Sequence, residues 1–402
     1  MIDNTQIQEK IILVGVSTDG EDIEKSLDEL AELVASAGGK AVGRVTQNLE
    51  GFNHKTYVGS GKLQEIKAYA EMMDADAICC DDELSPVQMR NLNDILGLKV
   101  MDRTMVILDI FAARATTHEG KIQVELAQMQ YRATKLIGLG KQMSRTGGGI
   151  GTRGPGEKKL EIDRRRIHDR ISLLKKELTE VEKHRETARK QRKKNEKKVA
   201  AIVGYTNAGK STLLNTLTGA DILSEDKLFA TLDPTTRVLE LKNNQSILLT
   251  DTVGFISKLP HNLVEAFKST LEEAVYADII IHVVDASDLH FDDKMKVVYE
   301  TLESLNIKNK PVITLFNKCD AMTNEEVLVD TRAKKSFRIS AKWGIGLDSF
   351  CEELSTFLRT GRALRSITLS YAEAGKVYDY KSRYEVIEEK YEEEAIVLVG
   401  YF

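Results

Sequence analysis

The segment GYTNAGKST at residues 204–212 combines glycines, a lysine and hydroxyl side chains at a spacing that suits phosphate chemistry. It follows the apolar run VAAIV and precedes STLLNTLTG, so the pattern predicts a strand, a loop and a helix. Backbone N–H groups of such a loop, together with the positive end of the helix, cradle phosphates. We expect Lys210 to reach the outer phosphates and the Ser211 hydroxyl to hold magnesium.

Two later segments carry groups suited to the metal and the terminal phosphate. DTVG at 251–254 ends a predicted strand, where Asp251 can hold a magnesium-bound water and the Gly254 N–H can meet the γ-phosphate. Between this segment and the first, LFATLDPTT offers Thr231, which can reach magnesium and sense the γ-phosphate. Together these segments predict a site for a nucleoside triphosphate and Mg²⁺.

The segments NKCD (317–320) and SAK (340–342) indicate which base is bound. The Asp320 carboxylate can accept hydrogen bonds from guanine N1–H and from the exocyclic amine. Adenine offers neither donor in that arrangement, so it would leave a buried carboxylate unpaired. The backbone of SAK would add contacts to the base oxygen. The sequence therefore favours guanine over adenine.

Candidate roles follow for each residue of these five segments. Catalysis is assigned to Lys210, Thr231 and Gly254, and magnesium to Ser211, Thr231 and, through water, Asp251. The nucleotide-binding candidates are Gly204, Tyr205, Thr206, Asn207, Ala208, Gly209, Lys210, Ser211, Thr212, Phe229, Ala230, Thr231, Leu232, Asp233, Asp251, Thr252, Val253, Gly254, Asn317, Lys318, Cys319, Asp320, Ser340, Ala341 and Lys342.

Two residues of the motifs concern the rate of hydrolysis. Many GTPases place glutamine after the DxxG glycine to orient the attacking water, but Phe255 stands there. We expect slow intrinsic turnover that is helped by a partner, a switch-loop rearrangement or a cation. Asn207 lies in GxxNAGKS, which resembles loops of potassium-stimulated GTPases, so K⁺ is a second candidate cofactor. The alternative for Asn207 is a simple hydrogen bond within the loop.

Residues 1–102 alternate apolar strands with helices, which is typical of a parallel sheet. Strands are expected at 11–16, 40–45, 76–81 and 98–101, and helices at 22–37, 62–73 and 85–96. YVGSGK (57–62) resembles a phosphate loop but lacks the full glycine spacing. A turn followed by a helix start is the alternative interpretation. The segment predicts an N-terminal α/β domain.

Residues 103–198 have a helical apolar pattern that is interrupted by SRTGGGIGTRGPGEKK (144–159). The stripes on the two sides are Ile122, Leu126, Met129, Ala133 and Leu136, then Leu160, Ile167, Ile171, Leu174, Leu178 and Val181. Their seven-residue register predicts an antiparallel helical hairpin with a glycine-rich tip. From 157 to 198 there are 17 Lys or Arg against 9 Asp or Glu. We expect RNA contact through Arg145, Arg153, Lys158 and Lys159, although such charge can also be a solvated helix face.

The remaining residues predict a P-loop GTPase domain at 199–362 and a small α+β domain at 363–402. In the GTPase domain, strands alternate with helices, and a turn at NNQ implies one antiparallel strand. The fold class expected is therefore multidomain α/β: an N-terminal α/β domain, an antiparallel helical hairpin, the GTPase domain and the C-terminal domain.

Composition limits the setting and the partners. A net charge of −5 on 402 residues leaves no bulk attraction to RNA or membrane, so any such contact must be local. The four cysteines form no CxxC pair, the N-terminus is polar, and the apolar runs are strand-length. We expect a cytoplasmic protein without a membrane anchor, and a monomer when it is not bound to its partner.

The longer motifs carry a family resemblance. FATLDPTTR and DTVGFI, preceded by EGKIQVELAQMQYR and SRTGGGIGTRGPGEKKLE, resemble the HflX family within the translation-factor class of P-loop GTPases. The resemblance covers nearly the whole chain and is weakest after residue 363. It implies GTP and GDP as ligands, binding to the large ribosomal subunit, and, for some members, splitting of stalled or idle ribosomes. It also implies that the tip of the hairpin reaches ribosomal RNA near the peptidyl transferase centre.

Two functions are compatible with these observations. The first is a ribosome-stimulated GTPase that acts in splitting or recycling under stress or stalling, in which GTP orders the switch loops and hydrolysis releases them. The second is an RNA-binding assembly factor or chaperone that uses nucleotide only as a conformational switch. Turnover measured with and without ribosomes separates the two.

Overall fold

The computed structural model describes residues 8–18, 22–146, 155–194, 198–219, 228–242, 245–260, 263, 268–307, 309–322 and 327–402. The chain divides into two compact units. The first comprises residues 1–181 and 258–267, and the second comprises residues 182–257 and 268–402. The four-part division expected above stays a prediction.

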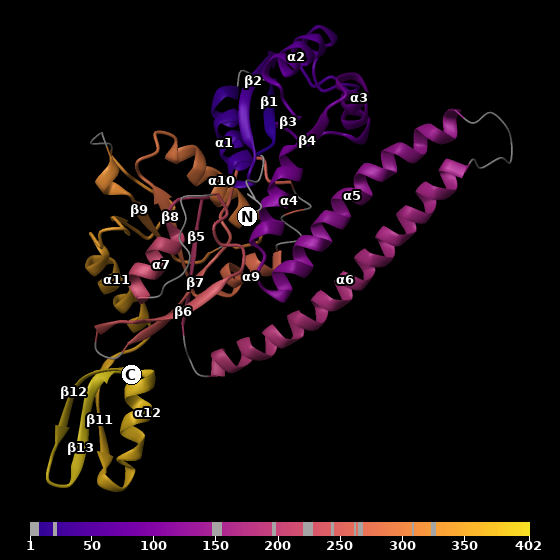
Figure 1. Ribbon diagram of the computed structural model, residues 1–402. Coiled ribbons are helices and arrows are strands. Elements are labelled where there is room, and N and C mark those ends of the chain that lie inside the picture. The colour runs from indigo at the N-terminus through magenta and orange to yellow at the C-terminus, as the bar shows by residue number, and fades with distance from the viewer. Residues whose placement is uncertain are drawn as a thin grey trace, which may run out of the picture. The chain divides into compact units, whose positions relative to one another are not determined.

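The first unit contains a parallel four-stranded sheet with the order β2-β1-β3-β4 (Figure 1). Its strands are β1 (Lys10–Ser17), β2 (Lys40–Asn48), β3 (Ala77–Cys80) and β4 (Lys99–Asp102). The helices between them are α1 (Ile23–Ser36), α2 (Ser60–Met73) and α3 (Pro86–Leu96). The alternation of strands and helices predicted from the sequence is confirmed, because every expected element is present within a few residues of its predicted bounds.

The YVGSGK segment is a turn followed by a helix start. Tyr57 is buried and its hydroxyl donates to Asp82 at 2.6 Å. The Gly59 N–H donates to Gln47 Oε1 at 2.9 Å, and α2 begins at the next residue. Groups of this segment are thus used in internal contacts. The structure therefore shows the turn and helix start, and not a phosphate loop.

Buried charges connect α4 (Arg103–Arg114) to the sheet. Arg103 is 1% exposed, and its Nη1 donates to Asp81 Oδ1 at 2.8 Å, while Nη2 pairs with Glu29. Lys258 belongs to the same unit, and its Nζ reaches Asp81 Oδ2 at 2.5 Å and Asp82 Oδ1 at 3.0 Å. Two cations therefore offset part of the desolvation of Asp81. Burial nevertheless raises the pKa of this carboxyl.

The antiparallel hairpin is formed by α5 (His118–Thr146) and α6 (Pro155–Lys194). Within the first unit, Ile122, Leu126 and Met129 of α5 pack against the apolar stripe of α6. That stripe consists of Ile171, Leu174 and Leu178, as the register predicted. Arg170 adds a bidentate pair with Glu125, with both N–O distances at 2.7 Å.

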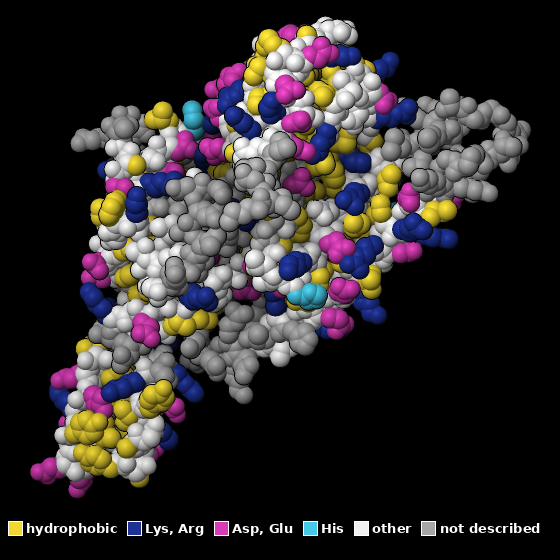
Figure 2. All heavy atoms as spheres, in the orientation of Figure 1, with side chains coloured by type: hydrophobic (Ala, Val, Ile, Leu, Met, Phe, Trp, Pro, Cys, Tyr) yellow, Lys and Arg dark blue, Asp and Glu magenta, His cyan; other side chains and the backbone are white. Residues whose placement is uncertain are grey.

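The predicted tip at 144–159 is shorter than expected. Helix α5 continues to Thr146 and α6 begins at Pro155, since proline is well accommodated in the first turn of a helix. Residues 147–154 lie outside the described residues, and with them Arg153. Nothing is described of the Arg145, Lys158 and Lys159 side chains. Along the described part of the hairpin, acidic and basic side chains are interleaved (Figure 2).

The second unit contains a six-stranded sheet with the order β10-β9-β8-β5-β7-β6. The strands are β5 (Val199–Gly204), β6 (Thr235–Glu240), β7 (Ser246–Asp251), β8 (Ile279–Asp285), β9 (Val312–Asn317) and β10 (Lys335–Arg338). Its helices include α7 (Lys210–Thr218), α9 (Lys268–Tyr276), α10 (Phe291–Ser304) and α11 (Leu347–Arg359). Strand β6 pairs antiparallel with β7, as the NNQ turn predicted, and the other pairs are parallel.

A three-stranded antiparallel sheet with the order β11-β13-β12 ends the second unit. Its elements are β11 (Leu364–Ser370), α12 (Gly375–Arg383), β12 (Glu385–Tyr391) and β13 (Ala395–Tyr401). Fully buried Glu385 accepts two hydrogen bonds from Arg359 of α11, at 2.6 and 2.7 Å, and one from Gln245. In the described part of the chain, no helix is long and apolar enough to cross a membrane.

Candidate functional site

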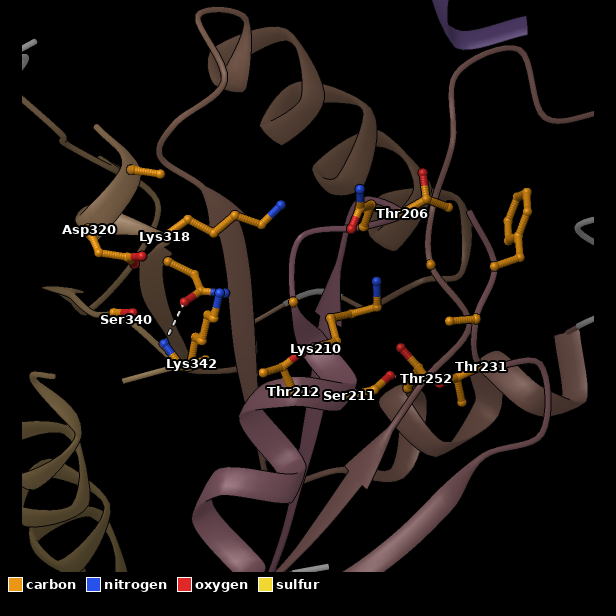
Figure 3. A pocket seen from close by; sticks show the side chains of 18 residues that line it. Thr206, Lys210, Ser211, Thr212, Thr231, Thr252, Lys318, Asp320, Ser340 and Lys342 are labelled. Carbon is orange, nitrogen blue, oxygen red and sulfur yellow. Dashed lines mark hydrogen bonds between the residues drawn. The ribbon is translucent and has the colours of Figure 1, made fainter. Parts of the chain in front are cut away.

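A cavity of about 500 Å³ lies at the carboxyl ends of the central strands of the six-stranded sheet. This volume is typical of a small-molecule site, and the position is the usual one for ligands of open α/β sheets. Figure 3 shows Asp320, Ser340 and Lys342 at one end of it, and Thr231 and Thr252 toward the other. The lining residues are Thr206, Asn207, Gly209, Lys210, Ser211, Thr212, Phe229, Ala230, Thr231, Thr252, Gly254, Asn317, Lys318, Asp320, Ala321, Ser340, Ala341 and Lys342.

All five predicted segments meet at this cavity, and Ala321 is the one lining residue that the sequence did not single out. Some predicted residues lie behind the lining instead. One of them, Asp251, contacts the lining residue Ser211, whose Oγ donates to Asp251 Oδ2 at 2.8 Å. These residues are Gly204, Tyr205, Ala208, Leu232, Asp233, Asp251, Val253 and Cys319.

Two glycines are required by the shape of the cavity wall. Gly209 has φ +91°, and a Cβ there would lie 2.3 Å from Asn317 Nδ2. Such a backbone conformation is open to glycine and strained for other residues. At Gly254 a Cβ would come within 3.0 Å of Lys210 Nζ and of the Thr206 backbone. The backbone of the DxxG segment therefore lies so close to the phosphate loop that a side chain at position 254 would not fit without a shift.

Lys210 is 7% exposed and its Nζ donates to the Tyr205 carbonyl at 2.7 Å. Burial lowers the pKa of Lys210 to about 8, against the attraction of Asp251. The Lys210 ammonium is thus a buried cation at the cavity. The oxygens of a bound phosphate would supply further acceptors for it.

The low pKa of Lys210 gives a pH dependence that can be measured. Phosphates bind the protonated amine and raise its pKa, so affinity is fully present below about pH 7 and falls as pH rises through about 8. The dissociation constant for GDP should increase roughly fourfold between about pH 7 and about pH 8.5. Isothermal titration calorimetry at constant ionic strength measures this, with circular dichroism confirming the folded state at each pH. An affinity that does not change over this range would contradict a phosphate contact at Lys210.

Three oxygen-bearing side chains converge beside Lys210. Ser211 Oγ lies 2.7 Å from Thr231 Oγ1 and donates to Asp251 Oδ2 at 2.8 Å. Asp251 is fully buried, and among the described residues its Oδ1 has no hydrogen-bond partner. A hard cation such as Mg²⁺ prefers this kind of donor set, and the buried carboxylate oxygen needs a positive or donating neighbour. The residues present therefore fit a magnesium ion.

Asn317 joins the two ends of the cavity. Its Nδ2 donates to the Ala208 carbonyl at 2.9 Å, and its Oδ1 accepts the Ala341 N–H at 2.8 Å. Asn317 itself is buried, so these bonds fix the phosphate loop against the SAK segment. The sequence predicted Asn317 as a ligand-binding residue, but this bridging role depends on distant loops that no local pattern reveals.

Asp320 differs from the expectation in one respect. Its carboxylate is exposed at the mouth of the cavity and not buried. The nearby Ser340 hydroxyl, and more weakly Trp343 and Lys342, lower its pKa, so it is an ionised acceptor at neutral pH. Selection of guanine over adenine then requires the bound base itself to cover the carboxylate.

Three family models match consecutive parts of the chain. They are described as GTP-binding GTPase N-terminal (residues 24–112), GTP-binding GTPase Middle Region (114–192) and 50S ribosome-binding GTPase (199–318). The chain is also 59% identical over 402 residues to GTPase HflX of Lacrimispora saccharolytica, covering all of this chain and 95% of that one. It is 40% identical over 398 residues to GTPase HflX of Escherichia coli, covering 98% and 93% of the two chains.

The chain belongs to the HflX family of GTPases. The resemblance found in the sequence motifs is thereby confirmed, and with it the GTPase activity and the multidomain α/β class. A solved GTP-binding protein from Sulfolobus solfataricus in complex with GDP is 26% identical. The match covers 86% of this chain and 98% of that one, with a TM-score of 0.45.

In this HflX-family chain, Phe255 is part of the core. Its side chain is 1% exposed, and its backbone pairs with the phosphate loop. Thr206 N donates to Phe255 O at 2.8 Å, and Phe255 N donates to Gly204 O at 3.1 Å. Beyond it, the Ser257 N–H donates to the Tyr205 hydroxyl at 2.7 Å. The residue after DxxG thus ties this segment to the phosphate loop and cannot orient water with its side chain.

Proposed function

We propose that the chain is a GTP-dependent switch that associates with the large ribosomal subunit and splits or recycles ribosomes under stress or stalling. The observation that carries the proposal is the match of residues 199–318 to a 50S ribosome-binding GTPase model, which covers most of the segments that line the cavity. The helical hairpin, whose sequence has a basic, glycine-rich tip, supports an RNA contact.

The residues of the cavity divide the work of hydrolysis. Lys210 and the loop N–H groups would bind phosphate oxygens, and Ser211, Thr231 and, through water, Asp251 would hold Mg²⁺. The ion would supply positive charge for the oxygens of the transferring phosphoryl group. Thr231 and the Gly254 N–H would sense the γ-phosphate, because both lie in segments that can move when it leaves. The phenylalanine at position 255 cannot orient the attacking water, so intrinsic turnover should be slow.

Turnover with and without purified large subunits tests the enzymatic part of this proposal. We expect stimulation of at least about tenfold, because completing a partly assembled transition-state environment removes about 1.4 kcal/mol or more from the barrier. Light scattering of intact ribosomes with the chain and GTP tests splitting. Stimulation without a loss of scattering would support binding alone and contradict splitting.

The hairpin tip provides a prediction that concerns RNA binding. We expect replacement of Arg145, Arg153, Lys158 and Lys159 by glutamine to weaken large-subunit binding and flatten its salt dependence. Each lost phosphate contact should reduce the log–log salt slope by roughly 0.7–0.9. Filter binding over a salt series measures both quantities. The matched control replaces four lysines of the second unit, Lys335, Lys376, Lys381 and Lys390. Identical slopes in the tip variant and the parent chain would leave the tip without this role.

A monovalent cation is a further candidate cofactor. Asn207 belongs to the phosphate loop and lines the cavity. A K⁺ ion held there would place a positive charge beside the phosphates. The apolar Phe255 side chain cannot supply such stabilisation. We expect intrinsic turnover to be several-fold faster in potassium than in sodium chloride, and Asn207→Ala to remove the difference. Equal rates in the two salts would reject the cation and leave Asn207 as a loop residue.

The second function, an assembly factor or chaperone that uses nucleotide only to change conformation, is favoured by one observation. The buried Phe255 leaves no water-orienting side chain after DxxG. Under this alternative, large subunits would bind the GTP-loaded chain without raising turnover, and intact ribosomes would not be split. The turnover and scattering measurements therefore separate the two functions.

A further inference from the structure

Trp343 is an exposed aromatic residue that contacts the base-reading end of the cavity. It directly follows the SAK segment and is the single tryptophan of the chain. Its side chain is 64% exposed, yet the indole Nε1–H donates to Asp320 Oδ2 at 3.1 Å. An indole N–H is only a donor, so this contact uses its entire hydrogen-bonding capacity on one carboxylate.

The indole approaches Asp320 from outside the cavity. Asp320, Ser340 and Lys342 line the cavity, whereas Trp343 does not. A bound base would therefore not need to displace the indole to reach the carboxylate. Since each carboxylate oxygen offers two lone pairs, Oδ2 can accept the indole N–H and still accept a second donor from inside the cavity.

The loop that carries Trp343 is fixed by its own backbone. Ser340 and Ile345 exchange two hydrogen bonds, each at 3.1 Å, so residues 341–344 form a closed turn. The Lys342 ammonium lies 5.2 Å from the centroid of the Trp343 ring, within the range of a cation–π contact. The turn thus fixes the backbone that carries the indole, and the contacts with Lys342 and Asp320 orient the ring.

A donor held in place outside the cavity restricts the rotation of the Asp320 carboxylate. Asp320 is exposed, so beside the Ser340 hydroxyl the indole is the second side-chain donor that limits its χ angles. Accepting N1–H and the exocyclic amine of guanine together requires both oxygens at defined positions. Fixing the acceptor before the base arrives reduces the entropy lost on binding.

We propose that Trp343 is a positioning residue for base discrimination, which holds the Asp320 carboxylate ready to accept two donors from guanine. This inference rests on the proposed reading of guanine by Asp320. It adds a residue outside the GTP-binding segments to the determinants of specificity. A base with one donor can be accepted by a carboxylate in several orientations, so the effect should be largest for guanine.

The test compares GDP with IDP, because hypoxanthine keeps N1–H but lacks the exocyclic amine. Trp343→Phe removes the indole donor and keeps an aromatic ring, and calorimetry gives the two dissociation constants. We expect GDP affinity to fall about threefold to tenfold, with a smaller change for IDP, so that the preference for GDP decreases. The matched control is Tyr378→Phe, which removes a polar tip from a 79% exposed aromatic residue on α12 and should leave both constants unchanged.

Each outcome of the comparison is decisive. A parental GDP-to-IDP preference in Trp343→Phe, or a tighter binding of GDP, would overturn the positioning role. Equal weakening of GDP and IDP would assign Trp343 only to the folding of the loop and would also overturn it. Asp320→Asn in the same assay tests the foundation separately: if it keeps the preference for GDP, the reading of guanine by Asp320 fails whatever Trp343 does.

Discussion

Asp320→Asn is expected to lower the affinity for GDP on the order of 100-fold and to admit xanthine nucleotides. The substitution replaces one acceptor oxygen by an amide donor that would face the N1–H or the exocyclic amine of guanine. Xanthine carries a carbonyl oxygen where guanine carries the amine, so it pairs with the amide. Calorimetric titrations with GDP and XDP measure the two affinities.

Two features of Asp320 support a large effect. Its carboxylate lines the cavity, and its lowered pKa keeps it ionised at neutral pH. The matched control is Asp292→Asn, an exposed carboxylate in the first turn of α10, which should not change either affinity. Unchanged GDP affinity in Asp320→Asn would show that NKCD does not read the base.

The second large effect is on the stability of the first unit. Arg103→Met should destabilise it by about 3 kcal/mol, because it removes one of the two cations that pair with the buried Asp81 carboxylate. Asp81 is fully buried, and Arg103 supplies the 2.8 Å contact to its Oδ1. Ser26 and Lys258 would still contact Oδ2, but Oδ1 and Glu29 would lose this cation.

Native-state hydrogen exchange at the amides of β1 and β3 measures this loss within the full chain. It reports on the first unit even if the two units do not unfold together. The control is Arg90→Met, which breaks an exposed pair with Asp94 at 3.4 Å and should cost less than about 1 kcal/mol. An equal loss of protection in the two variants would contradict the importance of the buried network.

Much of the fold could be predicted from local sequence patterns. Strand β8 (Ile279–Asp285) is a mostly apolar run that His282 interrupts. The seven-residue apolar register of α5 and α6 is enough to place Ile122 and Leu178 in one shared core. The GTP-binding segments could also be predicted, because each requires particular residue types at a defined place in the chain. Local periodicity and motif spacing were enough for these features.

Contacts between distant residues could not be predicted in the same way. Nothing in the sequence around Arg103 indicates that it pairs with Asp81 and Glu29, since the three residues lie on different elements. The backbone pairing of Phe255 with the phosphate loop was also missed, because the notable feature at that position was the absence of glutamine. The exposure of Asp320 and its contact with Trp343 depend on the geometry of two loops.

Cosedimentation with purified large ribosomal subunits tests the central claim most directly. The chain is centrifuged with subunits in a non-hydrolysable GTP analogue, in GDP, and without nucleotide, with Asp320→Asn as the nucleotide-binding control. We expect the chain to pellet with subunits in the analogue, to remain mostly in the supernatant with GDP, and to lose the difference in Asp320→Asn. Equal recovery in the analogue and in GDP, or no recovery in either, would contradict a GTP-dependent switch on the large subunit.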